Sequence, residues 1–219
     1  MEIDHIFICT EYNAPAANLL KSFGLTEGSS NTHPGQGTAN RRFFFKNFFI
    51  ELLWLENADE AKSAITAPTM LYDRLTSKSG DISPFGVCFR PNNQADREVK
   101  FPSWSYRPNY LPDSLEVNIA KNTSLYEPMW FFLSFALRPE LATEPKRQPL
   151  EHLNGLSEAT TIEMTIPNSD KNFSLSDLQQ LGILNIIDGS HHLLEITFDY
   201  GKQGLTYDFR PDLPMIFKY

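Results

Sequence analysis

The chain has few cysteines and no excess of basic residues, and each shortage excludes a class of protein. Two cysteines in 219 residues, Cys9 and Cys88, provide neither a disulfide framework nor a CxxC pair. Each lies in an apolar, strand-like run, so we expect buried free thiols. The 19 Lys and Arg residues are outnumbered by 27 Asp and Glu, for a net charge of −8. This balance disfavours a surface that binds nucleic acid or an anionic membrane.

Long apolar runs are also missing. The two longest, 43–55 and 129–137, are interrupted or shorter than the roughly 20 residues of a membrane-spanning helix. The opening Met1-Glu-Ile-Asp-His5 is acidic, whereas a secretory signal begins with basic residues and an apolar stretch. We therefore expect a cytoplasmic protein whose partner is a small molecule, with a homodimer as a candidate assembly.

The composition that remains is that of a folded protein rich in aromatic rings. Hydrophobic residues make up 41% of the chain and charged residues 21%, which is typical of an ordinary globular domain. Aromatic residues make up 13% and include 17 Phe, which indicates a core or cavity walled by rings. The length fits one globular unit over residues 1–219.

The first 56 residues predict a strand, a helix and a meander of strands. An apolar run at 3–9 reads as a buried strand, and 13–24 predicts a short helix that stops at Gly24. A polar loop at 28–38 is followed by strands at 40–45 and 48–55, with a turn at Lys46-Asn47. These residues form a first βαβββ module.

Residues 57–147 predict connecting elements and central strands. A helix interrupted by Pro68 is expected within 57–79, and strands are expected at 84–90 and around 130–135. Between these strands, 101–110 is rich in aromatic residues and prolines, which suits a sheet edge or a loop.

A second copy of the opening pattern is predicted at 148–199, followed by a tail at 200–219. It contains a strand at 160–167, a helix at 174–182, a strand at 183–187, a turn at Asp188-Gly189 and a strand within 191–199. The spacing from His5 to Gly24 (24 − 5 = 19) equals that from Glu163 to Gly182 (182 − 163 = 19). In this register Glu195 corresponds to Glu51. Pairing the two modules would bury the open face of each sheet.

Glu51 is the residue that most needs an explanation. An ionised carboxylate between Ile50 and Leu52 loses several kcal/mol of hydration unless a cation or hydrogen-bond donors compensate it. Because strand side chains alternate between faces, His5 and Glu51 can converge if their strands are neighbours.

Imidazole and carboxylate are ligands for Zn²⁺, Mn²⁺, Fe²⁺ or Ni²⁺, and the repeat would add Glu163 and Glu195 to His5 and Glu51. The alternatives are a hydrogen-bonded His5–Glu51 pair in a mixed core, or an ion pair of Glu51 with Arg41 or Arg42.

The loop before the Glu51 hairpin could bind an anionic ligand. Its amide and guanidinium groups can hold a carboxylate or a phosphate, although the ending that defines a P-loop is absent. The alternative is a glycine-bent turn whose polar groups brace the hairpin. The candidate ligand-binding residues, including two from the aromatic segment, are His33, Gln36, Thr38, Asn40, Arg41, Trp104 and Arg107.

The element order, together with His33-Pro-Gly-Gln-Gly-Thr-Ala-Asn40, resembles the glyoxalase-like domain family of the vicinal oxygen chelate superfamily. Glu151-His-Leu-Asn-Gly155 is similar to another element of that family. The resemblance implies an α+β fold, with paired βαβββ modules forming a curved mixed sheet around a cleft. It also implies, in enzymatic members, a divalent metal held by His and Glu from both modules. His5, Glu51 and Glu195 match ligand positions, whereas Glu163 stands where a His or Gln is expected.

Three functions are compatible with this resemblance. The first is a metal-dependent lyase or isomerase of a small oxygenated metabolite, with Glu51 or Glu195 as the catalytic carboxylate. The second is a non-catalytic protein of the same fold that binds or sequesters a small molecule. The third is an extradiol-type dioxygenase, which requires two His and one carboxylate as ligands.

Overall fold

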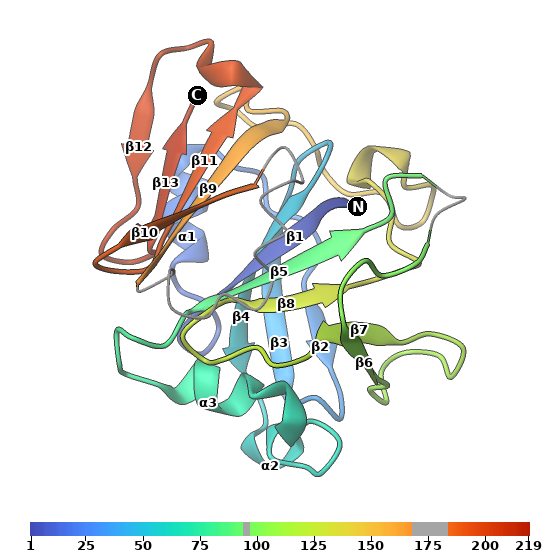
Figure 1. Ribbon diagram of the computed structural model, residues 1–219. Coiled ribbons are helices and arrows are strands. Elements are labelled where there is room, and N and C mark those ends of the chain that lie inside the picture. Colours follow the sequence, from blue (N-terminus) through green and yellow to red (C-terminus); the bar gives the residue numbers. More distant parts are fainter. Residues whose placement is uncertain (94–96, 168–183) are drawn as a thin grey trace.

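The computed structural model describes residues 1–93, 97–167 and 184–219, which form two mixed β-sheets that share a core (Figure 1). The larger sheet has eight strands in the order β2-β3-β4-β1-β5-β8-β7-β6. Its strands are β1 (Glu2–Cys9), β2 (Asn31–His33), β3 (Thr38–Phe44), β4 (Phe49–Leu55), β5 (Phe85–Arg90), β6 (Ser103–Tyr106), β7 (Val117–Ala120) and β8 (Met129–Phe132). The expected α+β class with a curved mixed sheet is confirmed.

Alternation along the central strands gives the larger sheet two different buried faces. In β1, Ile6 and Ile8 belong to the main core, whereas Phe7 belongs to a second apolar cluster on the opposite face. Strand β4 repeats this pattern, with Leu52 in the main core and Leu53 in the second cluster. The period of two therefore separates a face that packs inside the molecule from a face that lines a pocket.

A β-bulge at the start of β1 alters this alternation. Ile3 pairs with Phe89 and His5 pairs with Cys88, so that Asp4 is an extra residue between two consecutive partners on β5. Consequently Ile3 faces the main core, whereas Phe7 faces the second cluster.

The module that pairs with the first one is formed by β5 to β8, and not by residues 148–199 as the repeat predicted. Strands β1 and β5 are antiparallel neighbours at the centre, β4 is parallel to β1, and β8 is parallel to β5. The two halves of the sheet thus have the same strand arrangement. Among the described elements, β5 is followed by strand β6 and not by a helix. The strand-then-helix pattern that marked the first module is therefore not present in the described residues at the start of the second.

The smaller sheet has five strands in the order β10-β9-β11-β13-β12. They are β9 (Ala159–Pro167), β10 (Leu184–Gly189), β11 (Leu193–Phe198), β12 (Thr206–Asp208) and β13 (Met215–Lys218). Residues 200–219 are therefore part of this sheet. The helix expected at 174–182 lies outside the described residues.

The smaller sheet repeats the pairing pattern at the centre of the larger one. In both sheets a parallel pair, an antiparallel pair and a second parallel pair follow one another. In this comparison β9 corresponds to β1, but β10 corresponds to β4 and β11 to β5. Glu195 therefore lies on the strand that corresponds to β5, whereas Glu51 lies on β4. The predicted equivalence of Glu195 with Glu51 is wrong.

Short helices and aromatic rings connect the two sheets. Helix α1 (Ala17–Phe23) ends at Gly24, whose φ of 111° suits a residue without a side chain, and Phe23 packs on the rings of Phe209 and Phe217. His152 binds Thr26 N and Phe44 O, each at 3.0 Å, and so joins the second half of the chain to the first. The other helical segments of the described residues are α2 (Ala58–Ala61), η1 (Ala67–Thr69), α3 (Leu71–Thr76), η2 (Pro139–Leu141) and η5 (Asp199–Gly201).

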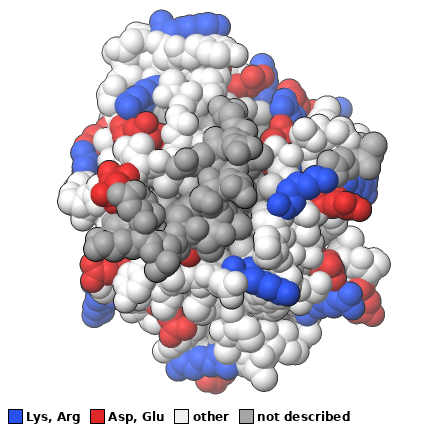
Figure 2. All heavy atoms as spheres, viewed as in Figure 1, with Lys and Arg blue, Asp and Glu red and all other residues white. Residues whose placement is uncertain are grey.

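The described residues agree with several expectations from composition. Both cysteines are free, Cys88 being buried and Cys9 partly buried. No helix in the described ranges combines the length and the apolarity that a membrane crossing needs. On the face shown in Figure 2, the Lys and Arg side chains are interspersed with Asp and Glu.

Candidate functional site

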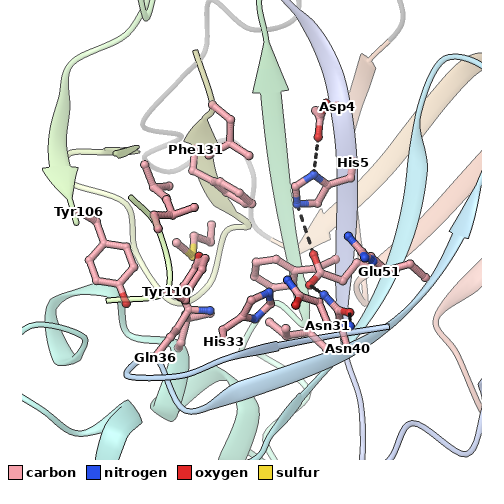
Figure 3. Close-up of a pocket in the computed structure, with 18 of the residues that line it drawn as sticks. Asp4, His5, Asn31, His33, Gln36, Asn40, Glu51, Tyr106, Tyr110 and Phe131 are labelled. Carbon is pink, nitrogen blue, oxygen red and sulfur yellow. Dashed lines mark hydrogen bonds and ion pairs between the residues drawn. The ribbon is translucent and has the colours of Figure 1, made fainter. Parts of the chain in front are cut away.

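A pocket of about 260 Å³ opens on the face of the larger sheet that carries the second apolar cluster (Figure 3). One side of it is polar and is supplied by the first module. The opposite side comes from 106–135 and is formed by aromatic and aliphatic side chains. The polar lining residues are Asp4, His5, Asn31, His33, Gln36, Asn40, Arg42 and Glu51.

Asp4, His5 and Glu51 form a buried chain of polar groups at this pocket. The Nδ1 atom of His5 lies 2.7 Å from Asp4 Oδ2, and its Nε2 atom lies 3.3 Å from Glu51 Oε2. All three residues are at most 6% exposed. The bulge in β1 allows the first contact, because consecutive residues of a regular strand point to opposite faces. The predicted convergence of His5 and Glu51 is what the structure shows.

Arg90 stabilises the charge of Asp4. Its guanidinium is 1% exposed and donates from Nη1 to Asp4 Oδ1 at 3.0 Å, while its Nε donates to Glu2 at the same distance. Burial raises the pKa of Asp4, but the hydrogen bond and charge of His5 and the charge of Arg90 outweigh it and lower the pKa overall. Asp4 is therefore ionised and accepts the Nδ1 proton of His5, which fixes the orientation of the ring.

Glu51 is compensated by donors on two neighbouring strands. Asn40 donates from Nδ2 to Glu51 Oε1 at 2.6 Å, and Arg42 lies directly opposite Glu51 in the β3–β4 ladder. His5 Nε2 lies 3.3 Å from Glu51 Oε2, which places the imidazole within ion-pair distance of the carboxylate. The desolvation that singled out Glu51 in the sequence is thus offset by an imidazole, an amide and a nearby guanidinium.

A second hydrogen-bonded group presents His33 to the pocket. Gln36 donates from Nε2 to Thr38 Oγ1 at 2.7 Å, and the same hydroxyl is hydrogen-bonded to His33 Nδ1 at 2.9 Å. Burial lowers the pKa of His33, an effect that the charge of Glu51 partly opposes. The bond to Thr38 engages His33 Nδ1, so Nε2 is the ring nitrogen that can meet a ligand in the pocket.

Four of the seven predicted ligand-binding residues, namely Thr38, Arg41, Trp104 and Arg107, do not line this pocket. Arg41 points to the other face of β3, where it binds Glu27 through two contacts of 2.6 Å. Arg107 is exposed and pairs with Glu116 at 2.9 Å, and Trp104 lines a separate depression beside β7. Thr38 is buried and acts through its bonds to His33 and Gln36. The predicted positions His33, Gln36 and Asn40 are lining residues.

Glu163 and Glu195 are also absent from the pocket, so the predicted four-residue metal site is not assembled. These two residues face each other across β9 and β11 in the smaller sheet, and Lys218 binds Glu195 at 2.9 Å. Burial, followed by the hydrogen bond and charge of Glu195, raises the pKa of Glu163. The repeat at 148–199 placed Glu163 and Glu195 wrongly, because the strands that complete the sheet of the first module are β5 to β8.

One group of donor atoms could surround a cation in the described part of the chain. Atoms of Asp4, His5 and Cys88 lie within 4.8 Å of one another. The chemistry of this group fits a divalent ion poorly, because burial raises the pKa of the Cys88 thiol and the cationic Arg90 already holds Asp4. Within 106–135 no lining residue is His, Asp or Glu. The second module therefore offers no counterpart to His5 and Glu51 as ligands.

Sequence reasoning missed several residues of the site. Asp4 was not expected because the bulge that turns it toward His5 leaves no mark in the residue pattern. Arg42 was named only as one partner for Glu51, whereas strand alternation from Asn40 places it on the pocket face. The apolar wall, which includes Phe131 and Tyr110, was expected only as an aromatic-rich segment.

Comparisons with known proteins agree with this architecture. A family model described as a glyoxalase-like domain matches residues 3–114. A solved structure described as a hypothetical protein from Staphylococcus aureus has 13% identity and a TM-score of 0.56, with 99% of this chain and 98% of that chain covered. At this identity the likeness shows the fold alone. A search of curated proteins finds no match.

Two further solved structures are more distant. Methylmalonyl-CoA epimerase in complex with methylmalonyl-CoA and NH4+ has 14% identity and a TM-score of 0.39, covering 63% of this chain and 96% of that chain. A xylose isomerase-like TIM barrel/4-hydroxyphenylpyruvate dioxygenase fusion protein has 12% identity and a TM-score of 0.49, covering 90% and 36%.

Proposed function

Since the chain belongs to the glyoxalase-like domain family of the vicinal oxygen chelate superfamily, we propose that its pocket binds a small oxygenated metabolite and transfers a proton on it. The reaction class is that of a lyase or an isomerase. The observation that carries this proposal is the buried Asp4–His5–Glu51 chain, which ends on a pocket large enough for a few heavy atoms.

In this function Glu51 is the group that exchanges a proton with the ligand. Asp4 orients His5 through Nδ1, and His5 Nε2 takes or returns the proton that Glu51 gains or loses. The ring of His33 and the guanidinium of Arg42 bind and polarise a ligand oxygen. The apolar wall around Phe131 excludes water, which strengthens each of these interactions.

Metal dependence is not part of the proposed step. A site for zinc, manganese, iron or nickel needs about four ligands, and the pocket combines only His5 and Glu51 from the predicted set. The extradiol-type reaction requires two His and one carboxylate around one metal. It is disfavoured because His33, the second His of the pocket, is not part of the Asp4, His5 and Cys88 group whose donor atoms lie within 4.8 Å of one another.

Hydrogen–deuterium exchange tests the proposal without knowledge of the substrate. The protein is incubated in D₂O with a panel of 2-oxo and 2-hydroxy acids, and exchange at the carbon next to the carbonyl or hydroxyl is followed by proton NMR. Glu51→Gln should lower the exchange rate on an active ligand by at least about 100-fold, the usual contribution of a general base. Glu144→Gln, which removes an exposed carboxylate, is the matched control.

The same experiment separates the rival functions. Ligands that shift the melting temperature but never exchange would favour the non-catalytic binding protein, for which the apolar wall from 106–135 is the supporting observation. Activity lost in a chelator and restored by a divalent metal would favour the metal-dependent enzyme. Equal exchange rates in the wild type and in Glu51→Gln would contradict the proposed role of Glu51.

A further inference from the structure

A second cleft, of about 940 Å³, lies where the two sheets meet and shares no lining residue with the pocket described above. One wall comes from the start of α1, from α3 and from the loop after α3. The other wall comes from the turn between β10 and β11 and from residues 211–214. Nothing in the proposed proton transfer uses this cleft.

Two buried polar atoms without a partner identify the cleft as more than a gap between sheets. In the described ranges, the buried side-chain nitrogen and oxygen atoms that lack a hydrogen bond are Arg74 Nε and His192 Nδ1. Both residues line this cleft, and their side chains are almost closed off, at 3% and 6% exposure. A buried polar atom that is left unsatisfied destabilises the folded state, so two at one place call for a shared explanation.

The remaining bonds of each residue show what its free atom requires. Arg74 donates from Nη1 to the carbonyl oxygens of Ser83 and Leu125, which leaves its Nε–H as an unused donor. The Nε2 atom of His192 lies 3.0 Å from the carbonyl oxygen of Asp81. A carbonyl oxygen only accepts, so Nε2 carries the proton and Nδ1 is an unused acceptor. Burial lowers the pKa of His192, in keeping with a neutral ring.

A single partner of both atoms would accept one hydrogen bond from Arg74 Nε and donate another to His192 Nδ1. A carboxylate or a sulfate can only accept, whereas a phosphate that keeps one proton can do both. Lys78 and His191 add nearby cationic or titratable groups, and Glu11 and Asp212 are the acidic lining residues. The volume exceeds that of a phosphate ion, and the apolar side chains of Leu19, Leu75 and Ile82 line the remaining space.

We propose that this cleft binds a small phosphate-bearing metabolite, whose phosphate accepts from Arg74 Nε and donates its retained proton to His192 Nδ1. The site is independent of the proposed proton transfer at Glu51. It rests on two unsatisfied atoms that belong to residues lining one cleft.

Nitrogen-15 NMR of the histidine rings tests the proposal in the intact protein. Inorganic phosphate is titrated near neutral pH, with sulfate at equal ionic strength as the control that lacks a proton. The exposed His191 is replaced in His191→Gln to assign the signals, and His152, whose two ring nitrogens are both bonded, serves as the internal reference. Phosphate should shift the His192 ring signals saturably, while sulfate and the His152 signals show no such change.

A variant at the rim gives a second measurement that does not depend on the buried residues. Lys78→Ala should weaken phosphate binding by about threefold, as expected for one exposed charge, whereas the exposed Lys121→Ala should leave it unchanged. The proposal is overturned if phosphate leaves His192 unaffected, or if sulfate acts equally. It is also overturned if crystals grown in phosphate show only a water that bridges Arg74 and His192.

Discussion

The charge of Asp4 should contribute measurably to stability, and Asp4→Asn tests this contribution with little change of shape. The substituted side chain can still accept the Nδ1 proton of His5, but it no longer balances the guanidinium of Arg90. Removal of one partner from a buried ion pair costs about 3 to 5 kcal/mol. Because Glu2 still binds Arg90 at 3.0 Å, we expect the lower end, about 3 kcal/mol.

Urea denaturation followed by circular dichroism measures this loss. For a urea dependence of about 2 kcal/mol per molar, the midpoint should fall by about 1.5 M near neutral pH. The pKa of Asp4 is lowered in the folded state, so its stabilisation is present above its ordinary value of 3.8 and is lost as pH falls through the folded pKa. The gap between the variant and the wild type should therefore narrow in acid.

The matched control is Asp208→Asn, which removes an exposed carboxylate paired with Arg210. Its midpoint should match that of the wild type, since solvent screens an exposed pair. A midpoint for Asp4→Asn within about 0.3 M of the wild type, or equal losses in the two variants, would refute the argument that burial makes the Asp4 charge important.

Two further substitutions test packing and charge elsewhere. Gly86→Ala should destabilise the protein by about 1 to 3 kcal/mol in the same urea assay, because an added Cβ would clash with the ring of Phe7. The control is Gly80→Ala, which should have little effect because an added Cβ there has no neighbouring atom within 4 Å. Glu163→Gln should stabilise the protein by about 0.5 kcal/mol near neutral pH, because it removes a like charge opposite Glu195. Since the pKa of Glu163 is raised, this gain should vanish below its ordinary value of 4.5, and a gain that persists there would contradict the charge argument.

The first half of the site could be read from local pattern because its elements are consecutive. The period of two in strands 3–9 and 48–55 allowed His5 and Glu51 to share a face if the strands were neighbours, and the structure places their side chains 3.3 Å apart. The loop before the hairpin contributed His33, Gln36 and Asn40 for the same reason. Short-range turns and alternation leave few other arrangements for such a segment.

The second half could not be read in this way, since similar patterns compete for the same role. Residues 148–199 match the opening pattern in spacing, yet β5 to β8 form the partner module because their strands pair with β1. The smaller sheet has its own repeat of the pairing pattern, which explains why the match was found. Pairing between distant strands depends on hydrogen bonds and on a shared core, and neither is visible in the spacing of one segment.

The sequence by itself determined the α+β class, the resemblance to the family, and the pair His5 and Glu51, because each rests on order and alternation within short stretches. Only the tertiary structure decided which residues stand around that pair. The bulge at Asp4, the buried Arg90 and the apolar wall that ends at Phe135 all depend on contacts with β5 and β8. For Glu51, the sequence showed that compensation was needed, and only the packed sheet showed that His5, Asn40 and Arg42 supply it.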